Sequence, residues 1–467
     1  MQAHTFGQAY TLPVPLWLYA WGASGALVIS FLIAAYFASG STNAVPATAR
    51  ERPEWLVLAQ RLRLGSVFRA LALAMLLLTL ATALFGTHDP RRNFSMTAFW
   101  LLFVLAFTYL TALVGNVYAA INPWRTLAEA VGRIWPGYLR GRLRYPERLD
   151  AWPALVLYFG FISYELFGWV RPPGFGVVLA GYTLLNLAAV WLVGAEAWFR
   201  HGELFSVLLR NVSLLAPVDV RRDEGGAMRV ATRPIGAGAL QERPARLASV
   251  LFVLFMLSST AFDGLHATQW WFRIFWGDPT GILTALVGAP PITEFAALRP
   301  WYHAWRVLCL AASPFLYLAL YLGALALSRR FARSPRSLRE LALDFVFPLL
   351  PIVFAYHVTH YYTLLVADGM KIVSLLSDPF GWGWNLFGVR ERFRATIIPD
   401  LTVTWHTQVG LIMLGHVASV ILAHRVALRV FGARAIVSQV PMVALMVAFT
   451  VFGLWILAQP LQATLVR

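Results

Sequence analysis

Residues 436–460 read IVSQVPMVALMVAFTVFGLWILAQP and contain no charged side chain. A helix needs about 20 predominantly apolar residues to cross the hydrocarbon core of a bilayer. Because lipid cannot hydrogen-bond an exposed peptide group, a run of this kind is expected to be helical along its whole length. This stretch therefore predicts a transmembrane helix, and the rest of the chain repeats its pattern.

Nine further apolar runs precede it in the 467-residue chain. Of all residues, 59% are hydrophobic and 13% are charged, whereas a soluble domain has about 45–50% and about 25%. This composition excludes a soluble enzyme, a disordered chain and a coiled coil. It predicts an all-α, polytopic transmembrane helix bundle that forms a single transmembrane domain over residues 1–467. The ten predicted spans are 15–37, 66–86, 97–120, 151–170, 174–198, 247–268, 301–327, 341–367, 401–423 and 436–460.

Basic residues gather in alternate connections between these runs. Of the 38 Lys and Arg residues, 26 lie in the connections after the first, third, fifth, seventh and ninth runs. Cytoplasmic connections of membrane proteins carry such an excess, so we expect these connections in the cytoplasm and both termini in the periplasm. The net charge of +16 is then explained by topology, and no nucleic-acid partner is expected. The expected location is a bacterial inner (cytoplasmic) membrane, crossed many times.

Three connections are long enough to have a role of their own. The sequence predicts that residues 200–246 form a solvated cytoplasmic loop. Residues 269–300 and 368–400 are rich in Trp, Gly and Pro and are predicted to be periplasmic loops. Since Trp concentrates at membrane interfaces, these two loops are expected to lie over the outer mouth of the bundle.

Several ionisable side chains fall within the apolar runs, where they are costly and usually mark function. A helix rises about 1.5 Å per residue, so the predicted topology gives each of them a depth. One group falls in the outer part of the membrane: Glu165, Asp263, His266, His303, His357, His360, Asp368 and His406.

Within this group, His357 and His360 are three residues apart and share one face of a helix. Two or three imidazoles with a carboxylate suit zinc, copper or iron. Asp263, His357, His360 and His406 are therefore predicted metal ligands, with Zn or Cu as the expected divalent metal. Such a metal could activate a water molecule as a nucleophile near the periplasmic face. A structural reading stands beside this one, because histidines near an interface often bury the ring and keep one edge wet.

His416 lies near the middle of its predicted span and needs a partner there. It could bond to another helix, ligate a cofactor or line a proton path. We assign it as a candidate cofactor-binding residue.

Five short segments follow one another in order along the chain and resemble one known family. They are FGQAYTLPVPLWLY (Phe6 to Tyr19), Gly115-Asn116 with Asn122-Pro123-Trp124, Phe262-Asp263-Gly264, His360-Tyr361, and Gly415-His416-Val417-Ala418. Together they resemble a bacterial polytopic inner-membrane family whose members carry the name fenitrothion hydrolase.

The resemblance implies hydrolysis of an organophosphorus ester at its aryl–oxygen bond, which is the activity of a phosphoric triester hydrolase. It supplies no catalytic residues. Relatives are expected to have a small or aliphatic residue in place of His357, which makes Asp263, His360 and His406 or His416 the better candidates. Of these, Asp263 and His360 are the predicted catalytic residues.

Three functions remain open on the sequence. The first is a metal-dependent hydrolase of small phosphotriester-like molecules. The second is a redox subunit that binds copper or haem b, because His360 and His406 are expected at similar depth on adjacent spans. The third is a transporter or a partner subunit of a membrane complex, which fits an even number of spans and broken helices. The expected partners are the lipid bilayer, a small-molecule substrate and, for the third function, a second protein subunit.

Overall fold

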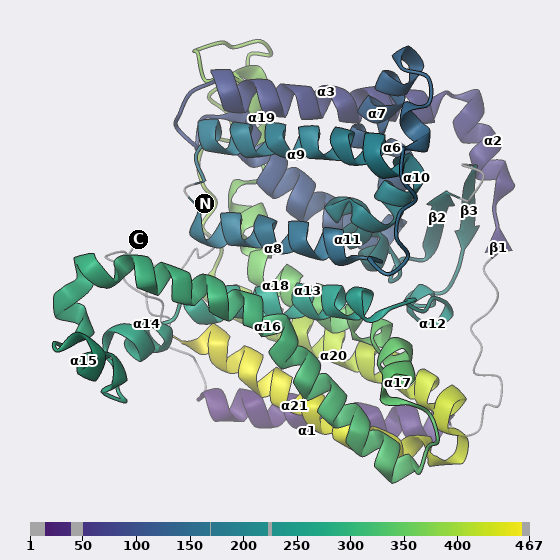
Figure 1. Ribbon diagram of the computed structural model, residues 1–467, viewed down its shortest axis with the longest axis vertical. Coiled ribbons are helices and arrows are strands. Elements are labelled where there is room, and N and C mark those ends of the chain that lie inside the picture. Colours follow the sequence, from purple (N-terminus) through teal and green to yellow (C-terminus); the bar gives the residue numbers. More distant parts are fainter. Residues whose placement is uncertain (1–14, 39–49, 169, 223–226, 460–467) are drawn as a thin grey trace.

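The computed structural model describes residues 15–38, 50–168, 170–222 and 227–459. Both chain ends lie outside this part, and so do residues 6–14 of the first segment that carries the family resemblance. Within the described part, long apolar helices run roughly side by side (Figure 1). This confirms the predicted all-α polytopic helix bundle of an integral membrane protein.

The described residues contain eight helical stretches that are long and apolar enough to cross a membrane. The last of them, Leu401–Ala458, covers two helices joined by a short turn, and Trp152–Phe167 is apolar but only 16 residues long. Each of the ten predicted ranges overlaps one of the bundle helices. In chain order these are α1 (Leu16–Ala38), α3 (Leu64–Phe85), α4 (Phe94–Met96) continued by η1 (Thr97–Phe107) and α5 (Thr108–Val114), α8 (Trp152–Phe167), α9 (Pro172–Val193), α13 (Leu247–His266), α16 (Phe295–Ala332), α18 (Leu350–Asp368), α20 (Leu401–Phe431) and α21 (Ala435–Ala458).

Some helix ends depart from the predicted ranges for identifiable reasons. α9 stops at Val193, before the predicted end at 198, because Gly194 has a φ of 85° and a Cβ there would lie 2.7 Å from a backbone oxygen of Arg140. α20 extends beyond the predicted end at 423, since its further residues Val426 and Ala427 are still buried. It ends at Gly432, whose φ is 57°.

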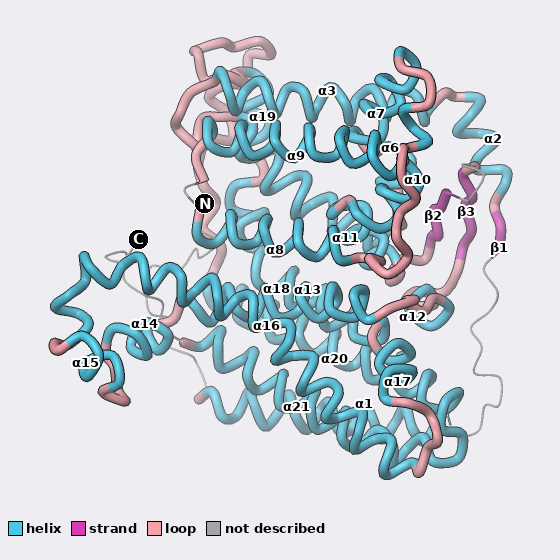
Figure 2. Tube along the Cα trace, viewed as in Figure 1, coloured by secondary structure: helices cyan, strands magenta, loops and turns pink. Residues whose placement is uncertain are grey.

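One end of the bundle carries the connections that contain most of the arginines. Figure 2 shows that the strands are confined to this end. They form a three-stranded antiparallel sheet in the order β1-β3-β2, in which Arg50 pairs with Thr232. The connection after α1 is therefore bound to the one before α13. The elements at this end are β1 (Arg50–Glu51), α2 (Pro53–Arg61), α6 (Tyr118–Ile121), α7 (Pro123–Ile134), η2 (Tyr138–Arg140), α10 (Ala195–Ala197), η3 (Trp198–Gly202), α11 (Leu204–Ser213), β2 (Val218–Arg222), β3 (Met228–Thr232), α12 (Gly238–Gln241), α17 (Leu338–Phe345), η5 (Phe347–Leu349) and η6 (Gly432–Arg434).

The predicted solvated loop 200–246 is structured over much of its described length. α11 buries Leu204, Phe205 and Leu209 in the main core, and β2 and β3 form a hairpin. Glu203, which is fully buried, begins α11 by accepting hydrogen bonds from the backbone N–H groups of Phe205 and Ser206. The run 204–213 has ten residues, which is too short for a predicted span, so sequence periodicity did not separate it from a loop.

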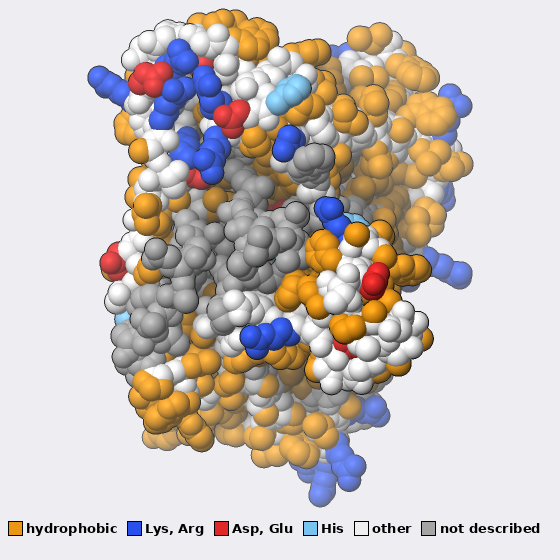
Figure 3. All heavy atoms as spheres, turned by 90° about the vertical axis from the view of Figure 1, so that its left-hand side faces the viewer, with side chains coloured by type: hydrophobic (Ala, Val, Ile, Leu, Met, Phe, Trp, Pro, Cys, Tyr) orange, Lys and Arg blue, Asp and Glu red, His pale blue; other side chains and the backbone are white. Residues whose placement is uncertain are grey.

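The other end of the bundle holds the two Trp-rich connections, the first residues of α1 and the last residues of α21 (Figure 1). Figure 3 looks onto this end and shows charged side chains among hydrophobic ones. The two connections contain α14 (Gln269–Trp276), α15 (Ile282–Val287), η4 (Pro291–Glu294) and α19 (Lys371–Ser377).

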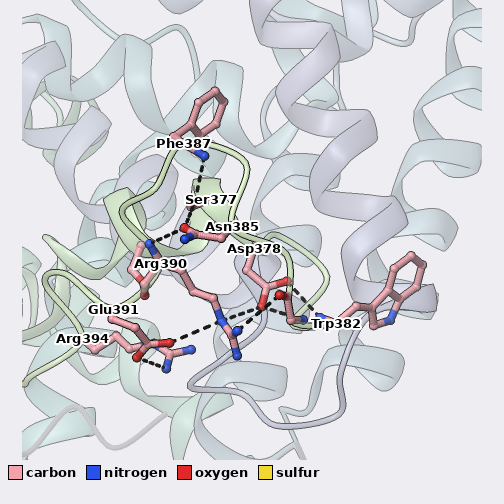
Figure 4. Close-up of polar contacts among 10 residues, drawn as sticks. Ser377, Asp378, Trp382, Asn385, Phe387, Arg390, Glu391 and Arg394 are labelled. Atoms are coloured by element: carbon pink, nitrogen blue, oxygen red, sulfur yellow. Dashed lines mark hydrogen bonds and ion pairs between the residues drawn. The ribbon is translucent and has the colours of Figure 1, made fainter.

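A buried carboxylate holds the second of these connections in shape. Asp378 accepts hydrogen bonds of 2.9 Å from the backbone N–H groups of Trp382 and Gly383, and its Oδ2 lies 3.4 Å from Arg390 Nε (Figure 4). Asn385 Oδ1 accepts from the backbone N–H of Arg390 and from the hydroxyl of Ser377. The segment after α19 is therefore an ordered, hydrogen-bonded loop.

Helices α18 and α20 pack closely against each other. Gly415 of α20 lies against the backbone of α18, so a Cβ there would be 2.3 Å from Ala355 Cβ and 2.8 Å from Pro351 O. Small residues allow transmembrane helices to approach in this way. Across this contact, Gln408 of α20 donates a hydrogen bond to Thr359 O of α18.

We predict that Gly415→Ala lowers the free energy of unfolding by about 1–3 kcal/mol, because the added methyl group overpacks this contact. Gly410→Ala on the same helix is the matched control, since a Cβ there meets nothing within 4 Å. Denaturant unfolding in detergent, followed by tryptophan fluorescence, would measure both variants. Equal stability of the two would contradict the assigned α18–α20 packing.

Candidate functional site

A hydrogen-bonded cluster of Asp263, His360 and Tyr361 joins α13 to α18. His360 Nε2 lies 2.7 Å from Asp263 Oδ2, and Tyr361 Oη donates to the same oxygen at 2.8 Å. Because an ionised carboxylate only accepts hydrogen bonds, His360 donates through Nε2 when Asp263 is charged. Asp263 is 3% exposed, and the residues before it on α13 are buried on every side. The cluster is therefore an enclosed polar centre in an apolar bundle.

The end of α13 explains how Asp263 is presented. The helix ends at His266, whose Nδ1 donates to the backbone oxygen of Asp263 at 2.8 Å and lies 3.7 Å from Asp263 Oδ1. The imidazole also stacks on Phe262. Gly264 leaves room for α21, since a Cβ there would lie 2.7 Å from Ile456 Cγ2. Each residue of the tripeptide thus has a structural role: Phe262 stacks on His266, Asp263 accepts the hydrogen bonds from α18, and Gly264 allows close packing.

Two small cavities adjoin the cluster, and both are lined by Tyr361 and Glu165. Their volumes are ≈ 30 Å³ and ≈ 40 Å³. A volume of about 10–15 Å³ is enough for one water molecule if polar partners surround it. Glu165 comes from α8, and both cavities also touch Val104 and Leu105 of the π-helical η1. The arrangement places a second carboxylate beside the cluster, with room for a few water molecules between them.

His357 belongs to the larger cavity and not to the Asp263 cluster. It lies one helical turn from His360, and its ring packs 5.0 Å from Tyr361 and 5.8 Å from Tyr109. His357 Nδ1 and Tyr109 Oη are buried without a hydrogen-bond partner among the described residues. Water in the adjoining cavity is the natural partner for His357 Nδ1.

His406 lies on the opposite side of α20 from the cluster. Thr404 and Gln408 face α18, because Thr404 O accepts from Tyr362 Oη and Gln408 Nε2 donates to Thr359 O. Two residues along a helix are about 200° apart around its axis, so His406 points away. It is exposed, and its Nε2 lies 3.5 Å from Tyr19 Oη of α1. The predicted metal and haem sites both require His406 to lie beside His360. The structure does not bring these two residues together.

His416 is fully buried and lies deeper in the bundle. Its helix meets α18 near Pro351, which is nine residues, or roughly 13 Å, below His360. His416 Nδ1 donates to Ile412 O at 2.8 Å, and Nε2 has no hydrogen-bond partner among the described residues. The nearest aromatic contact is Tyr356, at a ring distance of 6.0 Å. His416 is thus separate from the Asp263 cluster.

Across the described residues, no three His, Cys, Asp or Glu side chains lie together as a metal-binding group. Of the four predicted metal ligands, the structure joins only Asp263 and His360. Tyr361 was absent from the predicted site residues, although it follows His360 directly. The predicted topology placed Glu165 in the outer part of the membrane but gave it no role. The sequence feature that could have identified it is that it is the single charged residue of the run 151–170.

Comparison with known proteins adds nothing to this geometry: no family model, no curated protein and no solved structure matches the chain. The site must therefore be interpreted from its own residues.

We predict that Asp263 and His360 are energetically coupled. Removing one partner leaves the other buried and unpaired, so Asp263→Ala and His360→Ala should each destabilise the protein, and the double variant should lose less than the two together. A double-mutant cycle should give a coupling energy of about 1–3 kcal/mol, measured by denaturant unfolding in detergent. The same cycle for Asp263 and His406 is the control, and it should be additive within about 0.5 kcal/mol. Additivity in both cycles would refute the pairing.

Proposed function

We propose that the protein transfers protons within the membrane along Glu165, Tyr361, Asp263 and His360, and that it is a proton-coupled transporter. The observation that carries this proposal is the enclosed carboxylate–imidazole–phenol cluster beside cavities of water size. Ionisable residues inside membrane bundles are typically proton relays or parts of a transport path. Histidine and a buried carboxylate can both exchange protons near neutral pH.

The hydrogen bonds of Asp263 supply a route from protonation to helix movement. An ionised Asp263 accepts from two side chains of α18 through one oxygen. A protonated carboxyl donates one hydrogen bond and accepts fewer, so protonation of Asp263 weakens the link between α13 and α18. A transporter needs such a link, because substrate access must change with the protonation state.

We predict that liposomes containing the protein equilibrate an imposed pH gradient faster than empty liposomes, as read by an internal pH-sensitive dye. Asp263→Asn keeps the shape of the side chain and removes its titration, so it should slow the flux at least tenfold. Glu165→Gln should do the same. His406→Ala, in which an exposed histidine is lost, should stay within twofold of the wild type. Flux in Asp263→Asn equal to that in the wild type would exclude the relay.

A second candidate function is hydrolysis of an organophosphorus ester, which the family resemblance implies and the Asp263–His360 pair favours. A carboxylate that orients an imidazole is the arrangement of a general base. In the proposed reaction, His360 takes a proton from water, the hydroxide adds to phosphorus, and the phosphorus–aryloxide bond breaks. Aryloxide leaves and takes a proton from solvent, and His360 releases the proton that it gained to solvent.

Two observations place this function second. The cavities beside the cluster, of ≈ 30 Å³ and ≈ 40 Å³, are too small for an aromatic ester. The described residues also do not bring together the donors that the predicted zinc or copper site requires. The haem alternative needs His360 and His406 in one site, and they lie on different faces.

If the protein is such a hydrolase, the purified protein releases p-nitrophenol from a dialkyl p-nitrophenyl phosphate. His360→Ala and Asp263→Asn should then lower the rate about 10²–10⁴-fold, the usual contribution of general-base catalysis. His406→Ala should retain the wild-type rate. Absence of release by well-folded wild-type protein would remove this candidate and leave the proton relay untouched.

A further inference from the structure

A basic pocket lies where α16 ends, at the end of the bundle that the arginine bias predicts to be cytoplasmic. Its volume is ≈ 330 Å³, and it is lined by Arg329, Arg330, Arg333, Ser334 and Leu338 together with Ala326. Arg329 and Arg330 lie in the last turn of α16, and Arg333, four and three residues further on, is the residue at which the helix ends. The backbone turns into the left-handed region at Arg333, where φ is 50°.

The three guanidinium groups are exposed, and no acidic side chain pairs with them among the described residues. Both acidic residues of the neighbouring helix α17 are already engaged. Asp344 forms ion pairs of 2.8 Å with Arg243 and 3.0 Å with Arg336, and Glu340 accepts hydrogen bonds from the backbone N–H and the hydroxyl of Ser337. The pocket therefore presents uncompensated positive charge next to the membrane-spanning part of α16. An anion is the complementary ligand.

An apolar strip leads from this pocket along α16 toward the middle of the bundle. Ala319, Gly323 and Ala326 are spaced by four and three residues on one face, and all three are exposed. A Cβ on Gly323 would meet nothing within 4 Å. The bulky exposed side chains of Leu320 and Leu327, which are seven residues apart, stand along one side of the strip. This line of small side chains, the channel, starts at the arginines.

We propose that this pocket binds the phosphodiester headgroup of an anionic phospholipid, whose acyl chain lies along the channel. Guanidinium groups bind phosphate oxygens through paired hydrogen bonds, and basic pockets at the cytoplasmic ends of membrane helices are known to hold anionic headgroups. Arginines that only set topology need charge near the helix end and no pocket. Here, three of them share one pocket with Ser334, and the apolar channel continues from it.

The test uses the purified full-length protein and native mass spectrometry in detergent with phosphatidylglycerol or phosphatidylcholine. We expect the wild type to bind phosphatidylglycerol at least tenfold more tightly than phosphatidylcholine. Arg329→Gln/Arg330→Gln/Arg333→Gln should abolish this preference. The control Arg61→Gln/Arg63→Gln/Arg425→Gln removes the same charge from exposed positions at the same end of the bundle and should retain it. Equal binding of the two lipids by the wild type, or an equal loss in both triple variants, would overturn the proposal.

Two further variants separate a loss of lipid binding from misfolding, and contact with the acyl chain from attraction between charges. If the triple variant fails to insert, the single variant Arg330→Gln takes its place. It should weaken phosphatidylglycerol binding severalfold. Gly323→Leu leaves the charge unchanged and fills the channel, so it should weaken phosphatidylglycerol binding severalfold and leave binding of glycerol 3-phosphate unchanged. Binding of both ligands unchanged in Gly323→Leu would refute the acyl channel.

Discussion

The hydrogen bonds that Asp263 accepts from His360 and Tyr361 are the constraint around which the interior of the bundle is arranged. Lipid offers no partner to a carboxylate, and a buried charge without partners costs several kcal/mol. Both donors come from α18, so α13 and α18 must lie side by side at this level. Gly264 lets α21 pack closely against α13, and Gly415 lets α20 pack closely against α18.

Three buried carboxylates of this protein show two different uses of the same group. Asp378 accepts from two backbone N–H groups and lies beside Arg390, whereas Glu203 accepts from two backbone N–H groups and from the hydroxyls of Ser206 and Tyr182. These two residues hold a helix start and a loop in shape. Asp263 accepts from an imidazole and a phenol on another helix, and those donors can move or change protonation. Asp263 alone of these three has an imidazole among its donors and cavities of water size beside its cluster, and these two features are the physical reason for placing proton transfer there.

The depth of the polar residues could be read from the sequence, but their direction could not. Asp263 and His360 were predicted as site residues because both fall in the outer part of their spans, and the structure joins them. His406 was expected beside them at the same depth, and it faces away because it lies between two residues that contact α18. His357, one turn from His360, faces a cavity instead. Tyr361 has an apolar ring and a polar tip, so the apolar pattern of its run did not distinguish it from a core residue.

The sequence by itself determined that the chain is an all-α membrane bundle. Whether a segment can span the hydrocarbon core depends on the length of its apolar run and on where charges interrupt it, and both depend only on the order of the residues. It also determined which residues are costly inside the membrane. The tertiary structure alone decided which of them meet. The rotation of each helix about its axis depends on close contacts such as those of Gly264 and Gly415, and those contacts join residues that lie far apart in the sequence.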